Sequence, residues 1–197
     1  IYSEDRYTEF IASAFESQGI PYAFLTGKKA SETKVVQFFL RILEWASDDY
    51  LYEKLAFVVE NQLMTFRNIQ DAENAEANQS PMICYNQYLR KGIGWGKERY
   101  TACAERVGNS DEAKKYQYFN RFLCELVDVF SKPTDCGETY KKLLELGKNY
   151  LFKSKEKNEI LKVLKEEIPV LQQAKVSSEE EGLRLLHEHL NALRIME

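Results

Sequence analysis

The strongest constraint on the fold is an apolar stretch, residues 35–43, that is too hydrophobic for a helix lying on a surface. Its apolar side chains recur at helical spacing and widen the apolar face beyond a single stripe: Val35, Val36, Phe38, Phe39, Leu40, Ile42 and Leu43. Ser31, followed by Glu32, is the predicted start of this helix, and Asp48 and Asp49 mark the break after it. Such a helix is buried on several sides, so the rest of the chain must pack around it.

The other periodic segments also predict helices. The clearest is the run Phe119, Phe122, Leu123, Leu126, Val127 and Phe130, which indicates an amphipathic helix that Ser110 and Asp111 begin. Further helices are expected at residues 3–17, 51–63 (with Asp48 or Asp49 as cap), 82–90, 98–107, 137–152, 160–171 (interrupted by Pro169) and 177–193. Pro21 restricts the extended segment 20–25 to the edge of a sheet.

These elements predict a mainly α, multi-helix domain with one or two short edge strands near the N-terminus. The polar, acidic segment 69–80 offers no core face, so we expect it to separate a segment 1–68 from a helical segment 81–197. No period of 30 to 40 residues repeats, which argues against a helical-repeat array.

Composition narrows the class of protein. With 197 residues, 44% hydrophobic and 29% charged, the chain has the make-up of an ordinary globular domain. The four cysteines (Cys84, Cys103, Cys124 and Cys136) are irregularly spaced, which favours reduced thiols in a cytoplasmic protein over a zinc site. No apolar run is long enough to cross a membrane, and no signal peptide is visible. Because the first residue is Ile1, we expect the chain to be cut from a longer one.

Several short motifs resemble UvrD-like superfamily 1 helicases, and more closely the AddB-like subunits of helicase–nuclease repair complexes. They are residues 7–10 (YTEF), 19–22 (GIPY), Gly27, 38–43 (FFLRIL) and 48–50 (DDY). The resemblance implies the edge of a second motor domain followed by a helical 2B-like insertion, within an ATP-dependent DNA repair protein. The Walker residues and nuclease motifs of such proteins are not among these residues, so the resemblance implies a non-catalytic region without a cofactor of its own. Its partners would be DNA, the rest of the parent chain and a second subunit.

The glycine loop, residues 91–97, is the one glycine-dense stretch of the chain. It fails as a phosphate-binding P-loop, because Lys91 stands at the first glycine position and Glu98 replaces the hydroxyl, and it fails as a dinucleotide fingerprint. Residues 92–94 are similar to the Gly-Ile-Gly element that contacts duplex phosphates in UvrD-like 2B domains. The candidate DNA-binding residues are Arg90, Lys91, Gly92, Gly94, Lys97 and Arg99, with Arg106 adding charge and Trp95 a flat face. The alternative is a simple helix connection with Trp95 packed inward.

A binding module for a protein partner remains open as a second hypothesis. Six aromatic residues around the glycine loop are numerous enough to line a groove for a partner helix: Tyr85, Tyr88, Trp95, Tyr100, Tyr116 and Tyr118. The net charge of −4 argues against a free-standing nucleic-acid binder but allows a local basic patch.

Catalytic and metal chemistry finds no support in the sequence. His187 and His189 are two residues apart on a predicted helix, so they point in nearly opposite directions and are expected at the surface. The acidic clusters at 48–49, 166–167 and 179–181 are explained by helix starts and charged helix faces. We therefore expect no catalytic residue, no metal site and no cofactor in these residues.

Overall fold

Helix α2 (Lys34–Ser47) is the central element of the structure, a computed structural model that describes residues 14, 15, 17, 18, 28–69 and 80–195. As expected from its sequence, α2 is buried on more than one side, and Val36, Phe38 and Ile42 have no exposed surface. It packs against α3 (Tyr52–Glu60), α7 (Cys136–Tyr150) and α10 (Glu179–Ala192).

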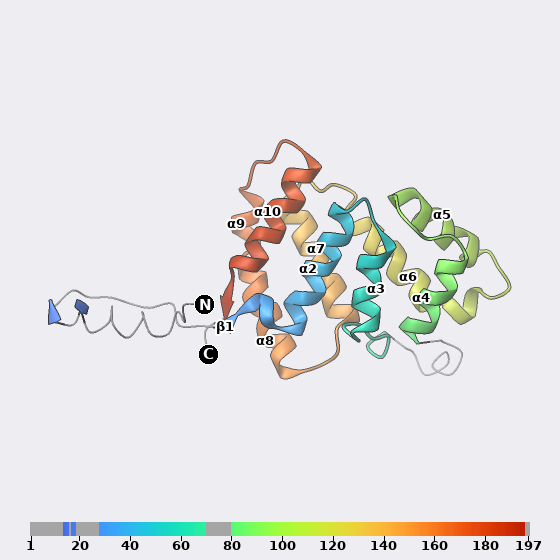
Figure 1. Cartoon of the computed structure of the whole chain (residues 1–197), viewed down its shortest axis with the longest axis horizontal. Coiled ribbons are helices and arrows are strands. Elements are labelled where there is room, and N and C mark those ends of the chain that lie inside the picture. The colour runs from blue at the N-terminus through green and yellow to red at the C-terminus, as the bar shows by residue number, and fades with distance from the viewer. Residues whose placement is uncertain (1–13, 16, 19–27, 70–79, 196–197) are drawn as a thin grey trace.

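The mainly α prediction is confirmed. After α3, the chain forms the following helices: α4 (Pro81–Arg90), α5 (Lys97–Gly108), α6 (Ala113–Val129), α7, α8 (Lys155–Glu166), α9 (Ile168–Gln172) and α10. Figure 1 shows α4, α5 and α6 gathered at one end of the body and α8, α9 and α10 at the other, with α2, α3 and α7 between them. Ser80 caps α4 by accepting from the Ile83 N–H, and Ser178 caps α10 by accepting from the Glu181 N–H. The helix expected at 160–171 is interrupted near Pro169, as predicted, since α8 ends at Glu166 and a separate short helix follows.

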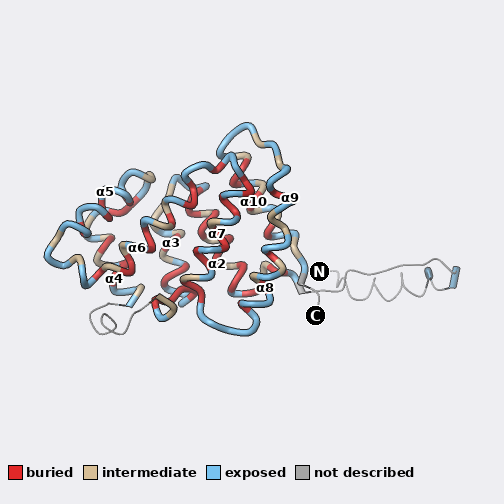
Figure 2. Tube along the Cα trace, turned by 180° about the vertical axis from the view of Figure 1, so that it is seen from behind, coloured by how far each residue is buried: buried red, intermediate tan, exposed pale blue. Residues whose placement is uncertain are grey.

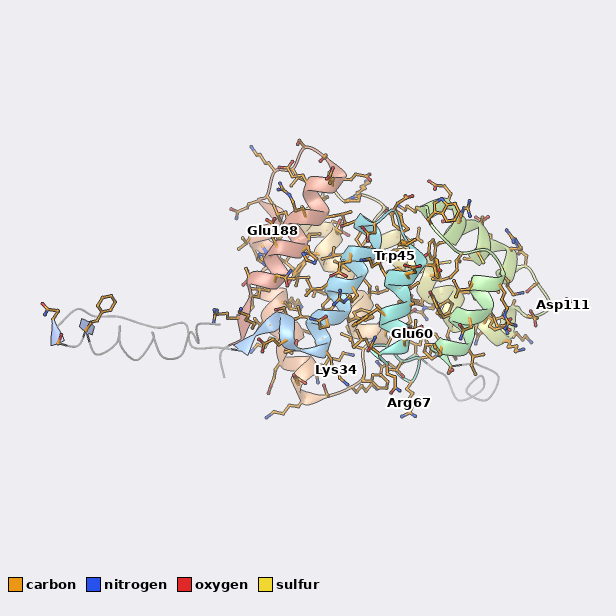
Figure 3. The ribbon with its side chains drawn as sticks, viewed as in Figure 1. Lys34, Trp45, Glu60, Arg67, Asp111 and Glu188 are labelled. Carbon is orange, nitrogen blue, oxygen red and sulfur yellow. The ribbon has the colours of Figure 1, made fainter. Side chains whose placement is uncertain are left out.

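One hydrophobic core runs through both ends of the body. Phe66, which lies before the expected boundary, makes ring contacts with Tyr118, Phe119 and Tyr150, which lie after it. Figure 2 shows the buried stretches of the helices facing one another across the molecule. Trp45 lies between these groups of helices, whereas Asp111 and Glu188 lie at opposite ends (Figure 3). The boundary expected at 69–80 falls mainly on residues outside those described, so the division at that point stays a prediction.

Helices α2 and α7 approach each other closely because one residue lacks a side chain. Gly147 faces the ring of Phe39, and a Cβ at Gly147 would overlap that ring. The close approach brings Phe39 into full burial. A larger residue at position 147 would force the two helices apart.

The extended structure is small. Strand β1 (Lys28–Lys29) pairs in antiparallel register with β2 (Arg194–Ile195), so the segment before α2 lies beside the segment after α10. The strand expected at residues 20–25 lies outside the described residues, as does most of the helix expected at 3–17.

Three expected helix caps are wrong. Ser31 lies in a 3-10 turn (Ala30–Glu32), and Thr33 caps α2 instead by accepting from the Val36 N–H. Neither Asp48 nor Asp49 caps α3, whose cap position is Leu51 with no side-chain hydrogen bond. Asp49 instead has a φ of 50° and belongs to a tight turn, a conformation that Asp adopts more readily than most residues.

The third wrong cap lies before α6. Ser110 donates its hydroxyl hydrogen bond back to the Val107 carbonyl, at the end of α5, and α6 begins three residues later at Ala113. Helix α6 itself carries the predicted buried face, with Phe119, Phe122 and Leu123 fully buried.

Candidate binding site

The glycine loop connects α4 to α5, and two of its glycines are required by the backbone. Gly92 has a φ of 104° and Gly96 a φ of 78°, both in the left-handed region that side chains disfavour. Gly94 does not have a positive φ and is buried. The two outer glycines therefore allow the chain to leave α4, turn and enter α5 within a few residues.

The loop is fixed to the turn that follows α2. The Gly94 carbonyl accepts a hydrogen bond from the Tyr52 N–H at 2.7 Å, and the Gly96 N–H donates to the Asp49 carbonyl at 2.7 Å. Ile93, next to Gly94 in the loop, is buried with 5% of its surface exposed. Two segments about forty positions apart in the chain, residues 48–50 and 91–97, thus form one site.

A buried tyrosine strengthens this junction. The Tyr100 hydroxyl, at the start of α5, donates to the Tyr50 carbonyl at 2.8 Å and accepts from the Trp45 indole N–H at 3.0 Å. The rings of Trp45 and Tyr100 meet edge to face with centroids 5.0 Å apart. Burial raises the pKa of Tyr100 to about 12, so its hydroxyl keeps its proton at neutral pH.

Trp95 stands on the outside of this fixed loop. Its side chain is 54% exposed, and the guanidinium carbon of Arg99 lies 3.9 Å from the centre of its ring. The alternative in which Trp95 packs inward is therefore wrong: the Gly94 and Gly96 contacts turn the backbone so that its side chain leaves the core. The stacked Arg99 restrains the indole by a cation–π contact of about 0.5–1 kcal/mol.

The predicted cations of the loop fall into two groups. Lys91 forms an ion pair with Glu112 at 3.2 Å, and Lys97 donates to the Phe130 carbonyl at 2.6 Å. Arg90 and Arg99 are exposed, and Arg99 is stacked on Trp95. The structure therefore gathers the six predicted residues in one region, but it uses both lysines for contacts within the protein.

The groove expected from the aromatic residues is not formed. Five of its six members are at most 5% exposed: Tyr85, Tyr88, Tyr100, Tyr116 and Tyr118. They pack inside the protein, where the rings of Tyr88 and Phe119 lie 4.9 Å apart and the ring of Tyr118 contacts Phe66. Their hydroxyls made them compatible with a surface, but the apolar rings are buried instead. Trp95 alone remains on the outside.

The two histidines contact different helices, in keeping with their opposite directions on α10. His187 lies 3.6 Å from the Glu44 carboxylate of α2, and His189 lies 3.4 Å from the Glu167 carboxylate beside α9. Both are partly buried and not simple surface groups, since their side chains are 33% and 20% exposed. Among the residues that the structure describes, no three histidine, cysteine or acidic side chains are grouped closely enough to hold a metal ion.

The acidic start of α10 is explained by local structure. The Glu181 carboxylate accepts hydrogen bonds from the Ser177 N–H and hydroxyl at 2.8 and 2.7 Å. These two bonds lower the pKa of Glu181. The arrangement is a helix-capping contact of the kind expected from the sequence.

Comparisons with known proteins give no match: neither a family model, nor a curated protein, nor a solved structure is significantly similar to this chain. In the described part of the chain, no helix is both long enough and apolar enough to span a membrane.

Proposed function

We propose that this chain is a non-catalytic, helical accessory domain of a cytoplasmic, ATP-dependent DNA helicase or helicase–nuclease, and that its glycine loop positions DNA. The observation that carries the proposal is the exposed Trp95–Arg99 pair, held outward by a loop that is hydrogen-bonded to the turn after α2. An exposed indole beside a guanidinium suits nucleic acid, because bases stack on aromatic rings and phosphates pair with arginine.

The position of the loop also supports the proposal. Two segments that resemble UvrD-like and AddB-like proteins, residues 48–50 and 92–94, are distant in sequence. They are joined through the hydrogen bond from the Tyr52 N–H to the Gly94 carbonyl and the one from the Gly96 N–H to the Asp49 carbonyl. Residues that act together on one DNA molecule must lie close together, as these two segments do.

The exposed positive charges of the loop are the residues to mutate in a test of DNA binding. Arg90 and Arg99 are exposed, whereas removal of Lys97 would also break its bond to the Phe130 carbonyl and disturb folding. The experiment is therefore binding of a labelled forked duplex, followed by fluorescence anisotropy at low and moderate salt, to the wild type and to an Arg90→Ala/Arg99→Ala variant.

A matched control removes two exposed positive charges elsewhere. Lys141 and Lys148 lie on α7, with side chains 60% and 69% exposed, so a Lys141→Ala/Lys148→Ala variant changes the net charge equally. We expect salt-sensitive binding by the wild type and the control, and a loss of about tenfold or more in the arginine variant. Absence of binding at low salt, or an equal loss in the control, would overturn the proposal.

A protein partner, such as a second subunit, is the second candidate. It is favoured by the acidic residues near the loop, Glu98 and Glu112, which weaken the local positive potential. Tryptophan and arginine are also the residue types most enriched at the centres of protein interfaces. In this case the forked duplex would not bind, and mutation of Trp95 would weaken binding to the partner with little dependence on salt.

A further inference from the structure

We propose that Trp95 stacks on an unpaired base, so that the glycine loop recognises a single-stranded tail or the opened end of a duplex and not uninterrupted double-stranded DNA. This inference rests on the proposed function, since it names the form of DNA that the same loop would bind. It makes Trp95 the main recognition residue, with the two exposed arginines in a supporting role.

The geometry of the indole favours stacking on a base. Arg99 lies over the Trp95 ring at 3.9 Å, and yet Trp95 is 54% exposed to solvent. A flat ring with free surface, restrained by a stacked guanidinium, suits the face of a nucleobase. Bases inside a duplex are already stacked on both faces, so only an unpaired or terminal base offers a free face.

The rigidity of the loop also favours stacking of Trp95 on a base. The loop is fixed through the Gly94 carbonyl and the Gly96 N–H on either side of Trp95, and Ile93 is buried next to them. The indole is therefore presented in nearly the same place before and after binding. A base that stacks on it orders little of the protein, which keeps the entropic cost of binding small.

The loop has few positive charges available for phosphates. Lys91 is paired with Glu112, Lys97 with the Phe130 carbonyl and Arg106 with the Lys91 carbonyl. This leaves Arg90 and Arg99, for whose side chains the described residues show no hydrogen bond or ion pair. Proteins that hold duplex DNA through its backbone commonly neutralise about six to ten phosphates. Two arginines are too few for that mode, but they suffice for the phosphates flanking one stacked base.

The backbone of the loop is open to solvent at Gly92. Gly92 is exposed, and a Cβ placed on it would meet no atom within 4 Å. The backbone of a DNA strand can therefore come close to the loop at Gly92. Glu98 lies near Gly96, since its carboxylate is 3.7 Å from the position of a Cβ on that residue. Its negative charge disfavours a phosphate beside Gly96.

The experiment compares three DNA molecules that share one sequence: a blunt hairpin, the same hairpin with a single-stranded tail, and the tail alone. Binding to every variant is followed by the fluorescence anisotropy of labelled DNA, and in the wild type also by the fluorescence of Trp95. The chain has two tryptophans, and Trp45 is fully buried, so a Trp95→Phe variant reports the Trp45 signal alone. The variants are Trp95→Ala, Trp95→Phe and, as a control, Phe152→Ala, which removes an exposed aromatic ring (44% exposed) outside the loop.

The proposal predicts a preference for unpaired DNA that depends on the indole. Tailed and single-stranded DNA quench Trp95 and bind more tightly than the blunt hairpin. Trp95→Ala weakens their binding by about 5- to 100-fold, Trp95→Phe weakens it less, and Phe152→Ala leaves it unchanged. The logarithm of the affinity falls with the logarithm of salt concentration with a slope of only about −1.4, as expected for two phosphates on a single strand.

Two results would overturn the inference, and they separate it from the proposed function. Equal binding of blunt and tailed hairpins with no effect of Trp95→Ala would refute base stacking and leave a DNA-positioning role intact. No binding of any of the three molecules would refute both, and would favour a protein partner for the loop.

Discussion

Replacement of Tyr100 by phenylalanine tests whether α5 and the glycine loop are held in place by buried hydrogen bonds. The Tyr100 hydroxyl serves both the Trp45 indole N–H, at 3.0 Å, and the Tyr50 carbonyl, at 2.8 Å. The Tyr100→Phe change removes only this hydroxyl and keeps the ring in its edge-to-face contact with Trp45. The effect on stability therefore reports the hydrogen bonds and not the packing.

The loss of stability follows from what the change leaves behind. Trp45 is fully buried, so its N–H loses its partner without access to water, at a cost of about 1–3 kcal/mol. The bond to the partly buried Tyr50 carbonyl contributes about 1 kcal/mol more. We expect the free energy of unfolding to fall by about 2–4 kcal/mol, a large part of the roughly 5–15 kcal/mol typical of a domain.

Tyr140→Phe is the matched control. Tyr140 is 1% exposed, like Tyr100, but its hydroxyl has no hydrogen-bond partner among the described residues. Removal of a buried, unpaired hydroxyl should leave the stability within about 0.5 kcal/mol of the wild type or raise it. Urea denaturation followed by circular dichroism measures both variants. A Tyr100→Phe variant as stable as the wild type, or a Tyr140→Phe variant that loses as much, would show that the Tyr100 hydrogen bonds do not hold this junction together.

Three further predictions follow from the same structure. Gly92→Ala should destabilise the protein by about 1 kcal/mol or more in urea denaturation, because Gly92 has a φ of 104°. Gly94→Ala should cost little stability, because its Cβ would meet Arg99 at an ordinary 3.7 Å. Equal losses of stability in the two variants would contradict the different roles of these glycines. Burial raises the pKa of Tyr50 and Tyr100 to about 12, so the folded state holds these protons more tightly than the unfolded state. Their contribution to stability should be complete below about pH 10 and fall as the pH rises from 10 to 12, by up to about 1.4 kcal/mol per pH unit for each tyrosine. A Tyr50→Phe/Tyr100→Phe variant whose free energy of unfolding falls just as steeply over this range would contradict this. Cys124 is the exposed one of the four cysteines, so one thiol per chain should react with a thiol reagent in the native state and the other three only on unfolding; fast reaction of a second thiol would show that the core is looser than described.

The helices could be predicted from the sequence where the apolar pattern and the end signals agree. The run from Phe119 to Phe130 indicated the buried face of α6, because apolar residues at i, i+3 and i+4 share one face of a helix but fall on both faces of a strand. Pro169 indicated the break before α9, since proline restricts the backbone wherever it occurs. These signals are local, so they do not depend on the rest of the fold.

The wrong predictions concern residues whose conformation or burial depends on neighbours that are distant in sequence. Asp48 and Asp49 have the side chains of caps, but the turn they form is set by the loop that hydrogen-bonds to it, and Asp49 takes a positive φ. The burial of the aromatic residues also depends on such neighbours. Tyr85 and Trp95 are both compatible with the core or the surface, yet Tyr85 is 1% exposed and Trp95 is 54% exposed. Nothing in their local sequence separates them.

The sequence predicted the residues of the candidate site but not their contacts with the rest of the protein. The glycine loop and its basic residues stand out in the sequence, because glycines and charges are concentrated there. That the loop meets the turn at 48–50, and that Lys97 is used by the Phe130 carbonyl, depends on contacts between residues more than thirty positions apart. Such contacts leave no spacing signal in a single sequence.

Whether the fixed loop presents Trp95 to DNA can be read from the indole N–H signals in a nuclear magnetic resonance titration. The chain has two tryptophans, so two such signals are expected, and the buried Trp45 serves as an internal reference. On addition of a hairpin with a single-stranded tail, we expect the Trp95 signal to shift while the Trp45 signal stays in place. A Trp95 signal that does not move while DNA binds would contradict the proposal, because the DNA would then be bound elsewhere on the protein.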